Sequence, residues 1–337
     1  MPRPLRSSRS DLSRRDALRL LAATGAGSAL GGSLLAGVSP ADPPDAASRE
    51  GTHNSESSAS QDASMRRREI PSSGELLPVV GLGTWQQFDV STSEKARAPL
   101  KEVLRTIVKL GGSVVDSSPM YGRAERVVGE LSEELGLTDE IFAATKVWTR
   151  GKQDGIRQME ASMDKMRHRP MDLTQVHNLV DWQTHLKTLR GWKKEGRVRY
   201  TGVTHYRTGA FDELARVIRK TDIDFVQLPY SIQTRRAEER LLPLAAENGV
   251  AVIVNRPYEG GALFRIVAGE PLPEWAQRFA DGWDQFFLKF ILSCPEVTCV
   301  IPGTSDPEHC RSNMRAGYGP LPDADTRQEM VRHFEQF

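Results

Sequence analysis

The sequence has 337 residues, a length that fits one large domain or two small ones. Charged residues make up 26% of the chain and the formal net charge is +1. This is an ordinary soluble composition, and it gives no reason to expect nucleic acid or an acidic surface as a partner. The cysteines, Cys294, Cys299 and Cys310, are odd in number and a poor disulfide framework, so we expect small buried apolar residues.

The N-terminal segment carries the basic excess of the chain. Residues 1–41 contain six Arg and two acidic residues, and the rest of the chain has a net charge of −3. Arg14 and Arg15 precede an uncharged stretch, residues 20–41, that is rich in Gly, Ala and Ser. This layout resembles a twin-arginine signal, which directs the export of folded proteins through the twin-arginine (Tat) machinery. A membrane anchor is the alternative, and the five glycines in the stretch disfavour it.

The next segment, residues 42–70, has no apolar periodicity and ends in three consecutive arginines. It predicts a disordered linker. Ser-Gly between two short apolar patches in residues 70–78 indicates a hairpin that could close the bottom of a barrel. The folded domain is then residues 71–337. We expect it to be exported to the periplasm or the cell exterior, to lie outside the membrane, and to be a monomer.

From Pro71 onward, short apolar runs alternate with amphipathic stretches of helical length. Helices are predicted at 101–110, 125–134 and 211–220, where apolar residues recur at three- and four-residue spacing. The apolar runs are Val79–Thr84, Ser113–Ser118, Ile141–Val147, Leu173–Asn178, Arg199–His205, Phe225–Tyr230, Val250–Arg256 and Thr298–Gly303.

This alternation predicts a parallel sheet, and eight units over about 250 residues fit a closed (β/α)8 TIM barrel in the α/β class. An open doubly wound sheet is the runner-up. That fold usually carries a glycine-rich dinucleotide fingerprint after its first strand, and Gly81-Leu82-Gly83 lacks the third glycine.

Four side chains that can act together in proton transfer follow the ends of neighbouring runs. Asp116 lies near the end of the second run and Tyr121 follows that run, Lys146 lies at the end of the third, and His177 at the end of the fourth. Active sites of such barrels lie at the carboxyl ends of the strands. Each residue alone has an ordinary structural explanation, but four complementary groups on three adjacent strand ends are harder to explain in that way.

Carbonyl reduction gives these four residues distinct roles. The reaction needs a hydride at carbon and a proton at oxygen, and the Tyr121 hydroxyl can supply the proton. The phenol pKa is about 10, and the Lys146 ammonium would lower it by favouring the phenolate. Asp116 would keep a buried Lys146 charged, and His177 would orient the carbonyl oxygen.

Several segments together resemble the aldo-keto reductase family, in order, from about Ile70 to Gly317. Val114–Gly129 (VVDSSPMYGRAERVVG) is similar to the signature around the family's catalytic aspartate and tyrosine. Gly81–Trp85 resembles its first strand, Gly202–His205 stands where the family has Gly-Val-Ser-Asn, and Val300–Thr304 with Asn313 resembles its C-terminal cofactor motif. The resemblance implies the catalytic tetrad Asp116, Tyr121, Lys146 and His177.

The resemblance also implies a nicotinamide dinucleotide held without a Rossmann fold, with the carboxamide meeting Thr204, His205 and Gln227. NADP(H) is the family default, and NAD(H) is an open alternative because Gly303, His309 and Ser312 depart from the usual charged positions. The full set of implied cofactor residues is Gly83, Thr84, Trp85, Asp116, Thr204, His205, Gln227, Arg256, Pro257, Gly303, Thr304 and Asn313.

Three further expectations concern the cofactor ring, the charges at the rim and the substrate. An aromatic ring that many members stack on the nicotinamide is replaced by Asn255, unless Tyr258 takes that place. Arg256 could contact the pyrophosphate or form an ion pair at the barrel rim. A small carbonyl substrate would meet an apolar pocket lined by Trp85, Trp148 and Trp182. The alternative role of these tryptophans is packing within the barrel.

The leading function is therefore an exported NAD(P)H-dependent carbonyl reductase. The alternative from another class is a regulatory or sensor module that binds the cofactor without significant turnover. A metal-dependent hydrolase lacks support, because no strand end carries His-x-His or a close carboxylate–histidine cluster, and we expect no metal.

Overall fold

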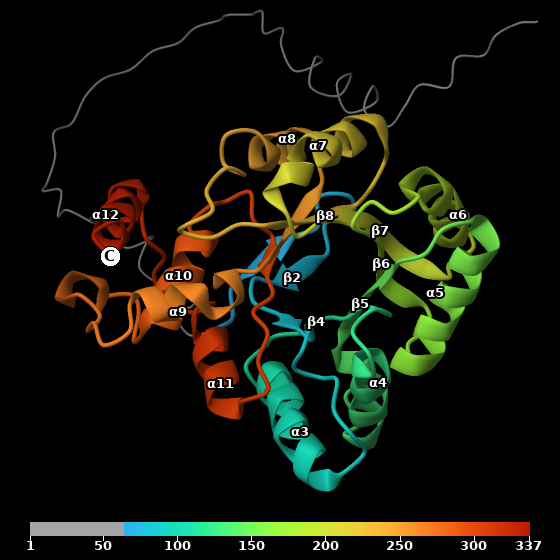
Figure 1. Ribbon diagram of the computed structural model, residues 1–337, viewed down its shortest axis with the longest axis horizontal. Coiled ribbons are helices and arrows are strands. Elements are labelled where there is room, and N and C mark those ends of the chain that lie inside the picture. The colour runs from blue at the N-terminus through green and yellow to red at the C-terminus, as the bar shows by residue number, and fades with distance from the viewer. Residues whose placement is uncertain (1–63) are drawn as a thin grey trace, which may run out of the picture. The chain divides into compact units, whose positions relative to one another are not determined.

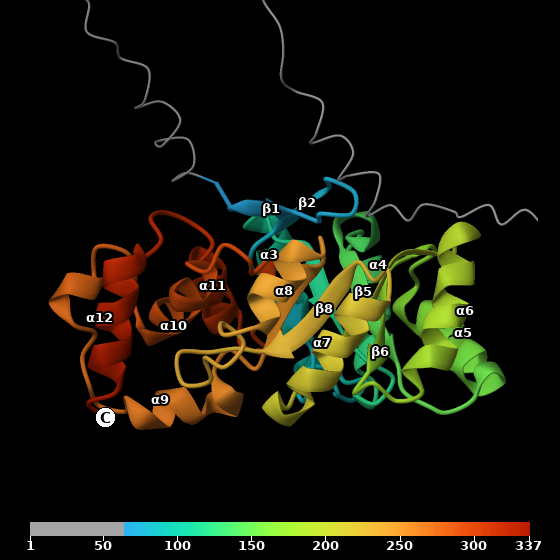
Figure 2. The same cartoon turned by 90° about the horizontal axis from the view of Figure 1, so that it is seen from above.

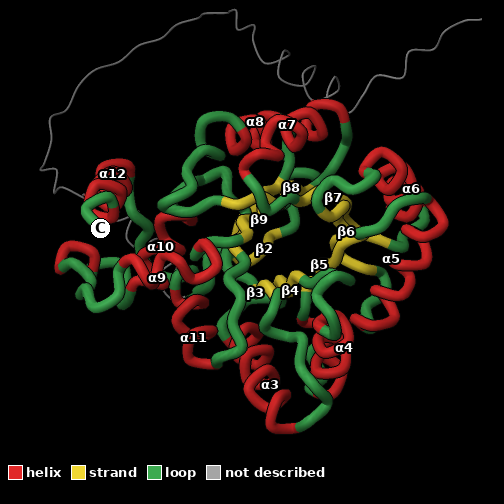
Figure 3. The backbone as a smooth tube through the Cα atoms, in the orientation of Figure 1, coloured by secondary structure: helices red, strands yellow, loops and turns green. Residues whose placement is uncertain are grey.

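The computed structural model describes residues 64–337, and it is built around a ring of eight parallel strands. Each strand pairs with the next one along the chain, so the order around the ring follows the sequence (Figure 3). The strands are β3 (Leu82–Gly83), β4 (Val114–Asp116), β5 (Phe142–Val147), β6 (Met171–His177), β7 (Val198–Thr204), β8 (Phe225–Pro229), β9 (Ala251–Asn255) and β10 (Cys299–Val300).

The ring is closed where the first strand meets the last. Parallel bridges join Val80 to Val300 and Gly83 to Gly303. The backbone there is so close that a Cβ on Gly83 would lie 2.9 Å from the carbonyl oxygen of Ile301. Only glycine fits such an approach. The predicted closed barrel is thus confirmed, and the open doubly wound sheet was the wrong alternative.

Helices surround the ring, because an amphipathic helix can bury its apolar face against the strands (Figure 1). In α7 (Phe211–Lys220) the buried residues Phe211, Leu214, Ala215 and Ile218 recur at three- and four-residue spacing. The helices predicted at 125–134 and 211–220 are confirmed in α4 (Ala124–Glu134) and α7, and the helix predicted at 101–110 is confirmed in α3 (Glu94–Lys109), which ends one residue earlier. The α-helices of the described residues are α3 (Glu94–Lys109), α4 (Ala124–Glu134), α5 (Lys152–Met166), α6 (Trp182–Lys194), α7 (Phe211–Lys220), α8 (Leu241–Glu247), α9 (Ala262–Ile266), α10 (Trp283–Leu292), α11 (Pro307–Arg315) and α12 (Ala324–Phe334), with short 3-10 helices at η1 (Thr138–Glu140), η2 (Thr208–Ala210), η3 (Glu259–Gly261) and η4 (Glu274–Ala276).

An antiparallel hairpin, β1 (Arg67–Glu69) and β2 (Leu76–Pro78), lies across one end of the ring (Figure 2). Its first strand falls within the segment predicted as a linker, so the predicted boundary at residue 70 is too late. Arg68 holds this strand against the barrel, because its guanidinium donates to the carbonyls of Leu292 (2.5 Å), Cys294 (2.8 Å) and Val297. Charged residues that resemble a solvated linker instead bind the carboxyl end of α10.

Alternate residues of each strand point into the barrel and fill it. The hairpin end of the interior is apolar, and it contains Ile70, Leu77, Val114, Phe142, Ala144, Leu173, Tyr200, Phe225, Ala251, Ile253, Cys299 and Ile301. Two to four residues further along the same strands the interior becomes polar, with Asp116, Lys146, Gln175, Thr204 and Gln227 all buried. A buried polar layer at the carboxyl ends of strands is the place to look for function.

The cysteines are free thiols; Cys299 and Cys310 are buried, as the sequence predicts, whereas Cys294 is only half-buried. Within residues 64–337, no helix is long and apolar enough to cross a membrane. The same residues contain no cluster of His, Cys, Asp and Glu that could hold a metal ion. The predicted signal, residues 1–41, and most of the predicted linker lie outside the described residues.

Candidate active site

The polar end of the barrel brings the four predicted catalytic residues together. Lys146 Nζ lies 2.5 Å from Asp116 Oδ2 and donates to the Ser117 carbonyl at 2.8 Å. The same ammonium lies over the Tyr121 ring, 5.1 Å from its centroid. The rings of Tyr121 and His177 pack edge to face, with their centroids 5.8 Å apart. Residues up to 61 positions apart in the chain thus form one cluster.

Lys146 is an ammonium held inside the barrel, with a side chain that is 0% exposed. Burial alone lowers a lysine pKa, but the attraction of Asp116 and Tyr121 outweighs it, and the pKa of Lys146 is raised. Lys146 therefore stays charged at neutral pH because a carboxylate lies beside it. This is the arrangement that the sequence analysis expected.

The Tyr121 hydroxyl experiences two opposing effects. Burial raises the pKa of the phenol above its ordinary value, while the Lys146 ammonium lowers it. Burial is the larger effect, so the net direction is upward rather than the lowering that the ammonium alone predicts. At neutral pH Tyr121 is thus a protonated phenol, which is the form that can give a proton.

His177 is a neutral imidazole in this site. Burial lowers its pKa from 6.5 to about 2, and the nearby Lys146 ammonium and His205 add to the effect. Its Nδ1 lies 2.9 Å from the hydroxyl oxygen of Ser118. The ring can therefore act as a hydrogen-bond partner across the physiological pH range without changing its charge.

Two glutamines extend the cluster across the barrel interior. Gln175 and Gln227 both donate through Nε2 to Asp116 Oδ1, at 3.2 and 3.0 Å. The carboxylate thus accepts hydrogen bonds from an ammonium and two amides, and all of these groups are buried. The sequence analysis missed Gln175. The signal was available, because Gln175 lies two residues before His177 on β6 and so points to the same side of the strand.

The residues predicted to meet the carboxamide lie beside this network. Thr204 Oγ1 donates to Gln227 Oε1 at 3.0 Å, and Asn255 Nδ2 donates to the same oxygen at 3.3 Å. His205 is half-buried, and its Nδ1 accepts the backbone N–H of Arg207 at 3.1 Å. Asn255 Oδ1 is buried and has no hydrogen-bond partner among residues 64–337. A hydrogen-bonded chain therefore runs from Thr204 through Gln227 to Asp116.

Other predicted cofactor residues already have partners within the protein. Gly83 and Gly303 form the bridge that closes the barrel. Thr84 is fully buried, with Oγ1 3.0 Å from both the Asp116 carbonyl and Ser117 Oγ. Thr304 Oγ1 accepts the backbone N–H of Asp306 at 3.1 Å. Each of the four shapes the strand ends around the site.

The remaining predicted contacts follow β9 and lie on α11. Arg256 Nη2 is 3.7 Å from Glu259 Oε2, an ion pair at the rim of the barrel, and Pro257 beside it is buried. Asn313 is buried and its Oδ1 accepts the Tyr258 hydroxyl at 2.6 Å. The ring of Tyr258 packs against Phe264, 4.7 Å between centroids, so the hydroxyl and the ring of Tyr258 already have protein partners.

Comparison with known proteins identifies this arrangement. The sequence profile of the Aldo/keto reductase family matches residues 79–329, which is most of the chain. The chain belongs to the aldo/keto reductase family. Its members are NAD(P)H-dependent carbonyl reductases, so the predicted class of enzyme and of cofactor is confirmed.

Individual relatives of this aldo/keto reductase are distant. Methylglyoxal reductase YeaE of Escherichia coli is 29% identical over 258 residues, which cover 74% of this chain and 89% of the relative. The NADH-specific methylglyoxal reductase of the same organism is 24% identical, with 77% and 96% covered. An aldo-keto reductase of Klebsiella pneumoniae, solved in complex with NADPH, has a TM-score of 0.69 at 23% identity and covers 80% of this chain and 96% of its own. That structural likeness shows the shared fold.

Two of the three predicted pocket tryptophans lie at the mouth of the reductase barrel. Trp85 and Trp148 are 48% and 42% exposed, which is unusual for so large an apolar side chain. The Trp148 ring lies 6.4 Å from the His177 ring. Trp182 differs, because it packs against the core and its Nε1 donates to Glu213 at 3.2 Å. The prediction for Trp182 as a pocket residue is not supported by this position.

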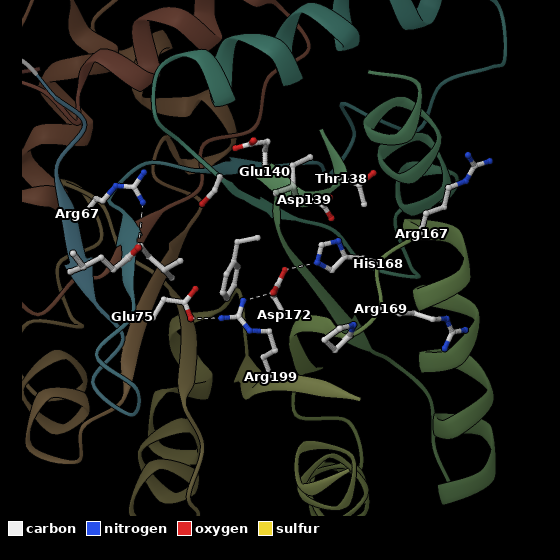
Figure 4. A pocket seen from close by; sticks show the side chains of 16 residues that line it. Arg67, Glu75, Thr138, Asp139, Glu140, Arg167, His168, Arg169, Asp172 and Arg199 are labelled. Carbon is white, nitrogen blue, oxygen red and sulfur yellow. Dashed lines mark hydrogen bonds and ion pairs between the residues drawn. The ribbon is translucent and has the colours of Figure 1, made fainter. Parts of the chain in front are cut away.

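A hollow of about 480 Å³ lies at the opposite, hairpin end of the barrel (Figure 4). Some of the residues that line it contact one another: Arg199 pairs with Asp172 at 2.6 Å and with Glu75 at 2.5 Å, and His168 Nε2 lies 2.7 Å from Asp172. These contacts join the hairpin to β6 and β7. In (β/α)8 barrels this face contributes stability, so we assign the hollow a structural role.

Proposed function

We propose that this protein reduces a small aldehyde or ketone to the alcohol, with Tyr121 as the proton donor. The observation that carries the proposal is the Lys146 ammonium, buried beside Asp116 and lying against the Tyr121 ring. Burying a charge is costly, and a purely structural barrel would be served as well by apolar residues. A charge kept at this position is explained by a proton transfer that it assists.

The proton moves from the Tyr121 hydroxyl to the carbonyl oxygen of the substrate. As the bond to hydrogen breaks, negative charge develops on the phenol oxygen, and the Lys146 ammonium stabilises it. Asp116 holds Lys146 in place and charged. The neutral imidazole of His177 provides a hydrogen bond that orients the carbonyl oxygen beside Tyr121.

The residues beside the cluster fit a nicotinamide group. A carboxamide has both donor and acceptor atoms, and this part of the barrel offers both kinds. Asn255 Oδ1 is a buried acceptor that has no partner in the described part of the chain, and Thr204 and Gln227 are hydrogen-bonded polar side chains next to it. We propose that these residues with His205 hold the nicotinamide, which supplies the hydride when it is bound.

The substrate class follows from the mouth of the barrel and from the relatives. Trp85 and Trp148 give the entrance apolar walls. Two of the relatives are named methylglyoxal reductases, and methylglyoxal is a small dicarbonyl compound. We therefore propose a small carbonyl compound as substrate, with methylglyoxal as the first to test.

The deciding experiment compares the wild type with Tyr121→Phe, using methylglyoxal and a generic aromatic aldehyde with NADPH or NADH. Removing a positioned acid costs about 10²–10⁴ in rate. Tyr121→Phe should therefore lose turnover while the cofactor still raises its melting temperature. Wild-type turnover in the variant refutes the role of Tyr121. A wild type that binds the cofactor but reduces no carbonyl favours the regulatory module instead.

We also propose that the protein is exported as a folded monomer with its cofactor bound. The support is the paired Arg14 and Arg15 before an uncharged stretch, together with the need for a cofactor that the cytosol supplies. Arg14→Lys with Arg15→Lys should then leave the protein in the cytoplasm. Normal export of that double variant excludes the twin-arginine route.

A further inference from the structure

Ser118 is a buried hydroxyl in contact with the proposed carbonyl-orienting residue. It lies two residues after Asp116, in the loop between β4 and α4, and its side chain is fully buried. Its Oγ is 2.9 Å from Nδ1 of His177. The proposed function assigns this hydroxyl no role, and the neighbouring Ser117 has a different partner, Thr84.

The surroundings of Ser118 favour one position for the shared proton. The backbone N–H of Met120 donates to Ser118 Oγ at 3.3 Å, which uses one of the two acceptor lone pairs of the hydroxyl oxygen. The hydroxyl has one hydrogen of its own to donate. In the part of the chain that the structure describes, the acceptor within reach of that hydrogen is His177 Nδ1.

The Lys146 ammonium opposes a second positive charge on His177 in the same buried site. The imidazole thus has one N–H, and it lies on the nitrogen that does not accept from Ser118. We propose that Ser118 is a positioning residue that holds neutral His177 in the tautomer with its proton on Nε2.

This tautomer is the one that the proposed reaction requires, so the inference rests on the proposed function. A carbonyl oxygen only accepts hydrogen bonds, and Nε2–H can donate to it. In the other tautomer, Nε2 would present a lone pair to the oxygen, and the Ser118 hydrogen would have no acceptor among the described residues. The hydrogen bond to Ser118 also resists rotation of the ring, which has Tyr121 and Trp148 as its aromatic neighbours.

The direct test is nitrogen NMR of the full chain with ¹⁵N-labelled histidine. His177→Gln identifies the His177 resonances by their loss. In the wild type we expect Nδ1 to resonate as an unprotonated, hydrogen-bonded nitrogen and Nε2 as a protonated one. A proton on Nδ1, or on both nitrogens near pH 7, overturns the proposal. This measurement needs no substrate, so it decides the tautomer even if the protein reduces no carbonyl.

The functional test is Ser118→Ala, which removes the donor and leaves the rest of the loop. A lost hydrogen bond of this kind should lower kcat about 5- to 10-fold. The dissociation constant of NADPH should stay unchanged, because Ser118 acts through the substrate-orienting ring. In Ser118→Cys the side chain has a similar size and a weak S–H donor, so its kcat should fall between those of the wild type and Ser118→Ala.

The matched control is Ser162→Ala on α5. Ser162 is also fully buried and lies outside the site, and its Oγ has no hydrogen-bond partner within the residues that the structure describes. Its removal should leave kcat unchanged. If Ser118→Ala folds, as judged by its melting curve, and keeps the wild-type kcat, the positioning role is wrong. The positioning role is equally wrong if Ser118→Ala retains the wild-type nitrogen resonances of His177.

Discussion

Replacing Lys146 with methionine separates the structural from the chemical role of the buried ion pair. Lys146→Met keeps the length of the side chain and removes its charge. Asp116, which is 2% exposed, then keeps only the amide donors Gln175 and Gln227, at 3.2 and 3.0 Å. Breaking a buried ion pair by removing one partner costs about 3–5 kcal/mol in the free energy of unfolding. For a domain of this size, that corresponds to a melting temperature lower by roughly 10 °C.

The double variant Asp116→Asn with Lys146→Met is the informative comparison. It removes both charges, so no carboxylate is left buried without its cation. Thermal denaturation should show that the double variant is more stable than Lys146→Met alone, although its chain carries one more substitution. Reduction should stay about 10²–10⁴-fold below the wild type in both variants, because neither has an ammonium beside Tyr121.

Two results would refute this reasoning. A melting temperature of Lys146→Met equal to that of the wild type means that Asp116 does not depend on the ammonium. A double variant destabilised by the sum of the two single effects means that the residues are not coupled. Either outcome removes the ion pair as the basis for tuning Tyr121.

Three further predictions test other parts of the structure. Folding lowers the pKa of His177 from 6.5 to about 2. Below pH 6.5 the unfolded chain therefore binds a proton that the folded protein does not bind. The free energy of unfolding should then fall by about 1.4 kcal/mol for each pH unit below 6.5. His177→Gln should show a shallower slope in denaturant titrations between pH 6 and 4, and a wild-type slope contradicts a neutral His177. Arg68→Ala should lower the free energy of unfolding by about 2–3 kcal/mol in the same assay, because three backbone carbonyls lose a charged donor. The stability of Arg68→Lys should fall between those of the wild type and Arg68→Ala. Gly83→Ala should lower the free energy of unfolding by about 1–3 kcal/mol, because its Cβ would lie 2.9 Å from a carbonyl oxygen. Gly209→Ala serves as the control, because a Cβ at that position would meet no atom of the described residues within 4 Å. Equal stability of the two variants excludes tight closure at Gly83.

The sequence by itself determined the order and kind of the elements. Apolar runs at strand length and stretches with helical spacing are local properties of the chain, and they predict eight repeated units. The rule that active sites lie at the carboxyl ends of barrel strands then selects Asp116, Lys146 and His177. Tyr121 follows from its place just after the second strand, in a motif that resembles the family signature.

The local sequence pattern did not predict the role of residues whose partners are distant in the chain. Arg68 resembles part of a solvated linker, and only the fold brings it to the carboxyl end of α10, 224 residues away at Leu292. Trp182 resembles the other tryptophans in sequence, yet its position on α6 turns it toward Glu213. Exposure and partners are properties of packing, and composition does not encode them.

The electrostatics of the site were decided by the tertiary structure alone. The sequence predicts that Lys146 lowers the pKa of Tyr121, but the depth of burial determines the net direction, and burial prevails. In the same way, the roles of Gln175 and Ser118 come from the distances to Asp116 and His177, which lie on other strands or loops. Desolvation and hydrogen bonding depend on where atoms lie in space, so the sequence identified the chemical groups and the closed barrel determined how they act.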